Sequence, residues 1–291
     1  MVETNTTKYT EAFEAFAPAL SLEEIDRRIS EILQEGYERN NTREVKKLLH
    51  STIDLTTLAG ADTEEKVAQL VGSVNDFEGT EDVPSVAAIC VYPNFVKTVR
   101  EVLTASGVQV ACVSGAFPAS QSFTEVKIAE TALAIAAGAD EIDIVLNLGA
   151  FLSGDYLEAS TEIEEQKATA RGALLKVILE TGALKEPELI RRASILALFS
   201  GADFLKTSTG KEYPGADLRA AYILCSVLRE YKDKYGEQRG VKFSGGIRSA
   251  EEAVKYYTLV EAILGKEWLD NRFFRIGASS LVGSLQQEIL G

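Results

Sequence analysis

The chain has 291 residues with 30 basic and 44 acidic side chains, which give it a net charge of −14. This charge disfavours nucleic acid and anionic membrane surfaces as partners, although a local cluster of lysines could still bind an anionic substrate. Three widely spaced cysteines and a single histidine, His50, do not make up an ordinary zinc site. With no evident signal peptide and no apolar run of about 18 residues, the sequence predicts a soluble, cytoplasmic protein without a metal or other cofactor.

The amino-terminal part of the chain is expected to form a helical extension, residues 1–45, ahead of the main domain. Its first 20 residues are polar and mixed, which predicts a loosely ordered segment. Ser21 and Glu24 then have the spacing of a capping box, which predicts that a helix begins directly after Ser21. The apolar side chains on one face of this helix are Leu22, Ile25, Ile29, Ile32 and Leu33.

From Leu48 onward, short apolar runs alternate with amphipathic stretches, a pattern typical of parallel α/β folds. The expected strands are 48–53, 86–91, 108–113, 141–146, 174–179, 204–207, 240–243 and 273–276. The expected helices between them are 63–74, 95–106, 124–137, 156–171, 187–199, 217–235 and 250–264. Eight strands, each followed by a helix, predict an eight-stranded parallel (β/α)8 barrel over residues 46–291. An open doubly wound sheet is the alternative, but no Gly-x-Gly-x-x-Gly motif follows the first strand.

Lys206 stands inside the predicted sixth strand, in the stretch ADFLKTSTGK of residues 202–211. Burying an unpaired ammonium group is costly, so a lysine here either has an acidic partner or gives up its proton. A free lysine has a pKa of about 10.4, and only about one in a few thousand is neutral at pH 7. A pKa lowered to about 7 would make Lys206 a nucleophile.

A repeated Gly-Ala-Asp motif predicts that Asp143 lies at the same height in the barrel as Lys206. Gly-Ala-Asp precedes the fourth strand at 138–140 and the sixth strand at 201–203, and three residues after each aspartate stand Asp143 and Lys206. Inward-facing side chains of alternate strands share a layer in such barrels, so both should point into the lumen. Lys242 occupies a similar position in the seventh strand, and Lys176 in the fifth is expected to lie deeper as a charge partner.

Lys206, Lys242 and Asp143 together suit Schiff-base chemistry. Two neighbouring lysines repel each other, which lowers the pKa of the less solvated one, while the carboxylate lets the other stay charged. One amine can then attack a carbonyl group while the charged amine and the carboxylate move protons. The alternative is a buried salt-bridge network that only holds the barrel together.

Glycine-rich loops form a second signal. The loops after strands seven and eight of such barrels commonly bind phosphate through backbone N–H groups at a helix terminus. Together with the end of strand six, these loops contribute Gly210, Lys211, Gly245, Gly246, Ser279 and Ser280. Tight-turn glycines with N-capping serines are the alternative.

The most specific stretches of the chain are DLTTL at 54–58, AICVYP at 88–93, EIDIV at 141–145, LKTSTG at 205–210, KFSGG at 242–246 and GASS at 277–280. In these stretches the sequence resembles the deoxyribose-phosphate aldolase family, from about residue 48 to residue 282. The resemblance implies a metal-free aldolase that splits 2-deoxy-D-ribose 5-phosphate reversibly into acetaldehyde and D-glyceraldehyde 3-phosphate through a lysine Schiff base. It also leaves a homodimer open.

Carried over to this chain, the resemblance makes Lys206 the Schiff-base lysine, Lys242 the second lysine that lowers its pKa, and Asp143 the carboxylate of the proton relay. Asp54 resembles a family acid that orients substrate hydroxyl groups. The implied phosphate contacts are Gly210, Gly245, Gly246, Ser279 and Ser280, with Thr209 and Lys211 nearby. Residues 286–291 carry no tyrosine of the kind that assists proton transfer in some relatives, so slower or water-mediated exchange is expected.

Two other functions stay open. The first is a Schiff-base aldolase that acts on another sugar phosphate or on a keto acid, because loop geometry decides specificity. The second is a phosphate-binding barrel without catalysis, in which the lysines serve only as salt-bridge partners.

Overall fold

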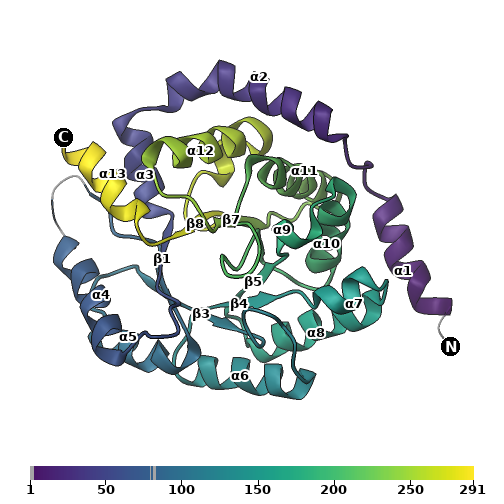
Figure 1. The fold of residues 1–291 in the computed structure, drawn as a ribbon, viewed down its shortest axis with the longest axis horizontal. Helices are drawn as coiled ribbons and strands as arrows, with labels where there is room; N and C mark the ends of the chain where they lie inside the picture. Colours follow the sequence, from purple (N-terminus) through teal and green to yellow (C-terminus); the bar gives the residue numbers. More distant parts are fainter. Residues whose placement is uncertain (1–2, 79, 81–82) are drawn as a thin grey trace.

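The computed structural model describes residues 3–78, 80 and 83–291. In this part of the chain, eight parallel strands close into a barrel in the order β1 to β8 (Figure 1). The strands are β1 (Ile53–Thr56), β2 (Ala88–Val91), β3 (Gln109–Ser114), β4 (Glu141–Val145), β5 (Leu174–Ile178), β6 (Phe204–Lys206), β7 (Gly240–Ser244) and β8 (Phe274–Ala278). The (β/α)8 barrel predicted from the sequence is confirmed.

Helices surround the barrel and connect its strands. They are α1 (Glu3–Glu14), α2 (Leu22–Asn40), α3 (Arg43–Ser51), α4 (Glu64–Phe77), η1 (Pro93–Phe95), α5 (Val96–Val102), α6 (Thr124–Ala136), α7 (Leu148–Leu152), α8 (Tyr156–Thr169), α9 (Thr181–Leu184), α10 (Pro187–Phe199), α11 (Leu218–Tyr235), α12 (Ala250–Leu264), η2 (Lys266–Trp268) and α13 (Leu281–Leu290). In the described ranges, no helix combines the length and apolar character needed to cross a membrane.

Side chains alternate along each strand between the hydrophobic core outside the barrel and the lumen inside it. On β4, Ile142 and Ile144 belong to the main hydrophobic core between strands and helices, whereas Glu141 and Asp143 make ion pairs across the lumen. On the β2 and β3 side the lumen is apolar instead. A separate small cluster lies there, formed by Leu58, Ala88, Cys90, Ala111 and Val113. The lumen therefore has a charged side and an apolar side.

The predicted first strand, 48–53, is wrong over most of its length. Residues up to Ser51 belong to α3, which begins where the Thr42 hydroxyl accepts a hydrogen bond from the Val45 amide. The strand itself is Ile53–Thr56. A short apolar run of this length covers the buried end of a helix and the start of a strand, and periodicity alone does not separate the two.

The prediction of a loosely ordered segment before residue 20 is also wrong. α1 occupies Glu3–Glu14, and the side chains of Tyr9, Phe13 and Phe16 are buried. The Phe13 ring packs edge-on against Tyr156, with 5.2 Å between ring centroids. These aromatic contacts order a segment whose own sequence has little helical signal.

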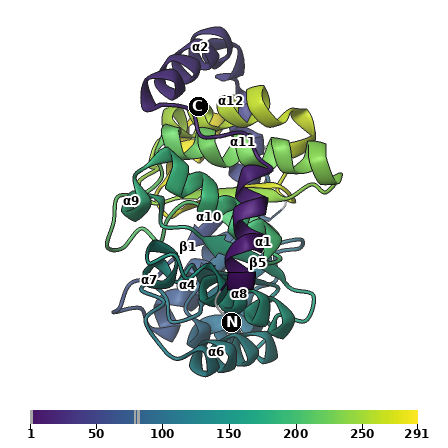
Figure 2. The same cartoon turned by 90° about the vertical axis from the view of Figure 1, so that its right-hand side faces the viewer.

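The amino-terminal helices wrap around the outside of the barrel. α1 lies against α8 and α10, and α2 lies across α11 and α12 (Figures 1 and 2). Half of the predicted capping box of α2 is present, since the Ser21 hydroxyl accepts a hydrogen bond from the Glu24 amide. The Glu24 carboxylate pairs with Arg27 and Arg28 instead of completing the box. Ile25 and Ile29 are buried beneath α2. This packing favours a single cooperative unit, and the division at residue 45 stays a prediction.

We expect Ile25→Ala to lower the free energy of unfolding of the whole barrel by about 2–4 kcal/mol, because it leaves a cavity under α2. Urea unfolding followed by far-UV circular dichroism should show one transition at a lower midpoint. Leu22→Ala on the same helix is the control, because Leu22 is 40% exposed against 1% for Ile25, and it should cost less than about 1 kcal/mol. A separate early transition in Ile25→Ala would instead indicate an independent extension.

Candidate active site

Lys206 is the last residue of β6, and its side chain points into the lumen. Only 3% of the residue is exposed. Its Nζ donates a hydrogen bond to Oδ2 of Asp143 at 2.8 Å. The prediction from the repeated Gly-Ala-Asp motif, that Asp143 and Lys206 lie at the same height, is therefore confirmed.

Lys242 completes a compact group with these two residues. Parallel pairing of β6 and β7 sets Lys242 beside Lys206, and its Nζ lies 2.7 Å from the same Asp143 oxygen. Lys242 also lies 2.5 Å from Oδ2 of Asp54. The structure thus brings together Lys206, Lys242 and Asp143, while their chemical roles stay predictions.

The two amines have opposite pKa shifts. Burial lowers the pKa of Lys206, Asp143 opposes this, and the charge of Lys242 lowers it further, so the pKa lies below its usual value. Burial also acts on Lys242, but the carboxylates of Asp143 and Asp54 outweigh it and hold the pKa of Lys242 above its usual value. Burial is thus the larger cause for Lys206, ahead of the lysine–lysine repulsion that the sequence suggested.

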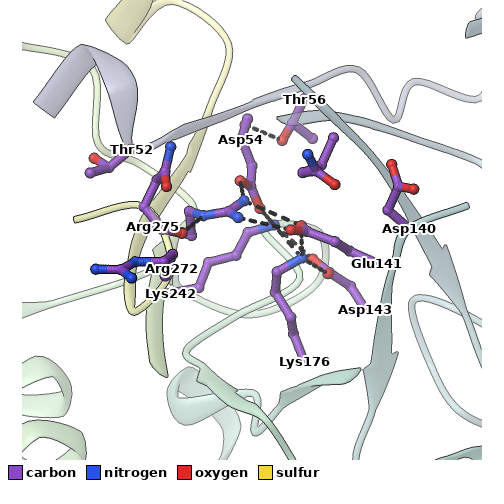
Figure 3. Close-up of polar contacts among 12 residues, drawn as sticks. Thr52, Asp54, Thr56, Asp140, Glu141, Asp143, Lys176, Lys242, Arg272 and Arg275 are labelled. Atoms are coloured by element: carbon purple, nitrogen blue, oxygen red, sulfur yellow. Dashed lines mark hydrogen bonds and ion pairs between the residues drawn. The ribbon is translucent and has the colours of Figure 1, made fainter. Parts of the chain in front are cut away.

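Asp54 lies beneath the amines and away from the mouth of the barrel. It is fully buried, and its Oδ1 accepts a hydrogen bond from Nη1 of Arg275 at 2.6 Å (Figure 3). Its pKa is lowered, since the positive charges of Lys242, Arg275 and Lys176 outweigh the effect of burial. Asp54 does not line the mouth cavity formed by the described residues. Its geometry fits the support of Lys242 better than contact with substrate hydroxyls.

A cavity of about 560 Å³ opens above Lys206 at the carboxyl ends of the strands. Its walls come from the loops after β1, β6, β7 and β8. The predicted binding residues that line it are Thr209, Gly210, Lys211, Gly245, Gly246, Ser279 and Ser280. Lys66 and Arg248 also line it, and sequence reasoning missed both. The cavity is therefore a cationic, glycine-lined pocket on an acidic protein.

Several polar groups at the mouth already have partners within the protein. The Thr209 hydroxyl donates to the Glu180 carboxylate at 2.5 Å. Lys211 Nζ donates to the Leu58 carbonyl oxygen, joining the loop after β6 to the loop after β1. Burial raises the pKa of Glu180, against the opposing hydrogen bonds from Thr209. Thr209 thus acts mainly as a support for the β5 and β6 loops.

Glycines allow these loops and side chains to come close together. A Cβ on Gly245 would lie 2.9 Å from the Gly215 Cα and 3.3 Å from the Gly210 Cα. A Cβ on Gly277 would lie 3.0 Å from Cε of Lys242 and 2.9 Å from the Ser244 Cβ. Gly277 on β8 therefore leaves the space through which the Lys242 side chain reaches Asp143.

Two further charged residues of the lumen were missed from the sequence. Glu141 stands two residues before Asp143, and Arg275 stands two residues before Gly277, so strand alternation puts them on the same inward faces. The Arg275 guanidinium contacts Glu141 at 2.8 Å and Asp54 at 2.6 Å. Lys176 lies below Lys206 as expected, 2.6 Å from Glu141 and 2.9 Å from Asp143. Within the described ranges, no cluster of three or more His, Cys, Asp or Glu side chains is arranged to hold a metal ion.

The chain is similar to known aldolases over most of its length. Residues 49–284 match the family model described as DeoC/LacD family aldolase. A Caenorhabditis elegans protein, named provisionally as a deoxyribose-phosphate aldolase, is 38% identical over 262 residues, which cover 89% of this chain and 86% of that protein.

Solved structures agree with this relationship. The deoxyribose phosphate aldolase of Aeropyrum pernix, described as a tetramer, is 31% identical with a TM-score of 0.67, over 88% of this chain and 96% of that one. A Coccidioides immitis protein, provisionally a deoxyribose-phosphate aldolase, is 29% identical with a TM-score of 0.71, over 92% and 98%.

The close approach of the mouth loops predicts different effects for two neighbouring glycines. Both have positive φ, +88° at Gly245 and +92° at Gly246, so alanine at either costs about 1 kcal/mol of strain. Only Gly245→Ala also overlaps the backbone of the loop after β6, whereas no described atom lies within 4 Å of a Cβ at Gly246. Gly245→Ala should therefore lose about 1–3 kcal/mol more stability in urea unfolding. Equal losses would contradict this packing.

Proposed function

Because the chain belongs to the DeoC/LacD family of aldolases, we propose that it cleaves 2-deoxy-D-ribose 5-phosphate reversibly to acetaldehyde and D-glyceraldehyde 3-phosphate through a Schiff base on Lys206. The observation that carries the proposal is the buried Lys206 amine at the floor of a cationic, glycine-lined cavity. Family membership makes the protein an aldolase, which sets aside the alternative of a barrel without catalysis.

The proposed first step is attack of the neutral Lys206 amine on the C1 aldehyde of the open-chain sugar. Loss of water from the resulting carbinolamine gives a protonated imine on Lys206. The lowered pKa of Lys206 supports this step, since a larger fraction of the amine is neutral near pH 7. Lys242 donates a hydrogen bond to Asp143. The charged Lys242 can give a proton and the Asp143 carboxylate can accept one as the carbinolamine forms and loses water.

Carbon–carbon cleavage follows from the imine. The C3 hydroxyl loses its proton, the C2–C3 electron pair moves toward the imine, and glyceraldehyde 3-phosphate leaves. The enamine that remains takes up a proton at C2, and water then releases acetaldehyde from Lys206. A protonated imine accepts this electron pair far better than a neutral aldehyde, which is why a lysine serves the reaction.

The two ends of the cavity fit the two ends of this substrate. Backbone groups of Gly245, Gly246 and Ser279, with the amino terminus of α13, suit the phosphate. At the other end, Lys206 lies near the apolar cluster that contains Cys90 and Val113. A two-carbon aldehyde has no polar group beyond its carbonyl, so this apolar side favours acetaldehyde over a keto acid as the donor.

The assembly and location of the protein remain proposals. We propose a homo-oligomer, in line with the homodimer that the family resemblance leaves open, and the Aeropyrum pernix relative is described as a tetramer. A cytoplasmic location likewise stays a prediction from the sequence.

Reduction with borohydride in the presence of acetaldehyde should attach an ethyl group to Lys206, located by peptide mass mapping. Lys206→Met should abolish both this adduct and the cleavage of deoxyribose 5-phosphate. Asp143→Asn should keep the fold but lower kcat by about 10²–10⁴-fold, because the proton relay is lost. An adduct on Lys242, or full activity of Lys206→Met, would overturn the assignment of the nucleophile.

Arg248→Ala should raise KM for deoxyribose 5-phosphate by about 10–100-fold with little change in kcat, because a charged hydrogen bond to phosphate contributes about 1.5–3 kcal/mol. Turnover of unphosphorylated deoxyribose should not change. Arg272→Ala is the matched control, because this exposed arginine precedes β8 and pairs with Asp270 instead of lining the cavity. Faster turnover of another aldol phosphate than of deoxyribose 5-phosphate would favour the alternative substrate.

A further inference from the structure

A layer of ion pairs crosses the lumen and joins side chains of several strands, namely Asp54, Glu141, Asp143, Lys176, Lys242 and Arg275 (Figure 3). Glu141 is held from two sides, by Nη2 of Arg275 at 2.8 Å and by Nζ of Lys176 at 2.6 Å. Arg275 also binds Asp54, and Lys176 also binds Asp143. Neither Arg275 nor Lys176 lines the mouth cavity of the described structure, so neither can touch a substrate bound there.

The charges in this lumen do not balance. Among the described residues, the basic groups that meet there are Lys176, Lys206, Lys242 and Arg275, and the carboxylates that pair with them are Asp54, Glu141 and Asp143. Fully ionised, the group carries one excess positive charge. An uncompensated charge among buried groups is unfavourable, so one of the basic groups is driven toward its neutral form.

The pairing pattern decides which group that is. Lys242 contacts two carboxylates, and Lys176 contacts Glu141 and Asp143, with Asp54 at 3.7 Å. Arg275 contacts two carboxylates and cannot deprotonate in a protein. Lys206 contacts only one described carboxylate oxygen, which it shares with Lys242. Lys206 is therefore the basic group that loses its proton when the excess positive charge is removed.

Other groups that face Lys206 do not change this count. Cys90 on β2 is buried, and burial raises the pKa of its thiol, which therefore stays neutral. Burial raises the pKa of Glu180, which follows β5 and accepts hydrogen bonds from Thr209, and the positive charge of Lys206 acts on this carboxyl group in the opposite direction. Glu180 forms no ion pair with any described lumen cation. Among the described residues, the four cations and three carboxylates are thus the charged groups that contact one another directly in the lumen.

We propose that Arg275 and Lys176 are positioning residues that keep the Lys206 amine unprotonated, by occupying the lumen carboxylates and supplying the excess positive charge. The inference deepens the proposed function, on which it rests for the identity of the nucleophile. It assigns the reactivity of Lys206 to the whole buried ion-pair layer, including residues that never meet substrate.

Competitive labelling of the Lys206 amine with acetic anhydride over a range of pH, read by peptide mass mapping, measures its protonation without any substrate. Arg275→Met leaves three cations with three carboxylates, so Lys206 should keep its proton to higher pH. The labelling midpoint should move at least about one unit to the alkaline side, which is about tenfold less neutral amine near pH 7. Lys176→Met alters the count in the same way from another strand and should shift the midpoint in the same direction.

Two further variants separate the charge count from a merely structural role. Arg275→Lys keeps the count and should keep the wild-type midpoint. Arg275→Met combined with Glu141→Leu removes one charge of each sign and should return the midpoint to near the wild-type value, because apolar replacement of a buried ion pair is often tolerated. A purely structural role predicts that this double variant is at least as impaired as Arg275→Met.

Unchanged or acid-shifted midpoints in Arg275→Met and Lys176→Met would overturn the inference, as would a double variant that stays alkaline-shifted. This result is distinct from failure of the proposed function, which would appear as the absence of an acetaldehyde adduct on wild-type Lys206. Should Arg275→Met not fold, Lys176→Met and the double variant still decide the question.

Discussion

One carboxylate oxygen, Oδ2 of Asp143, lies between the amines of Lys206 and Lys242, and the proposed chemistry depends on this shared contact. A single oxygen in a dry lumen cannot stabilise two ammonium groups equally well. Asp54 makes the two amines different, because it contacts Lys242 and not Lys206. The positive charge of Lys206 is therefore less well compensated than that of Lys242. The two lysines look alike in the sequence, yet only Lys242 has a second carboxylate partner among the described residues, and the pKa values of the two amines shift in opposite directions.

The closed barrel makes this arrangement possible. Every strand sends alternate side chains inward, so charged groups from β1 and from β4 to β8 meet in one network in the lumen although they are far apart in the chain. β2 and β3 send small apolar side chains inward instead, which leaves one side of the lumen apolar. The loops at the carboxyl ends then line the cavity that we propose for the phosphate group.

The sequence was enough to predict the barrel, seven of its eight strands to within two or three residues, and the meeting of Lys206 with Asp143. The rest depends on contacts across the molecule. The helix α1 is ordered by aromatic contacts such as that of Phe13 with Tyr156. The local sequence pattern of α1 does not predict these contacts. Glu141 and Arg275 follow the same two-residue alternation as Asp143, but their pairing joins β4 to β8 through the lumen. Asp54 was expected at the substrate, and its distances to Lys242 and Arg275 put it underneath.

Gly277 illustrates how an active side chain constrains the evolution of a neighbouring strand. The volume that a methyl group would occupy there is already filled by the stem of Lys242 and by Ser244. The packing at positions 242, 244 and 277 is therefore coupled, and a side chain added at 277 on the eighth strand requires Ser244 or the Lys242 stem on the seventh strand to shift.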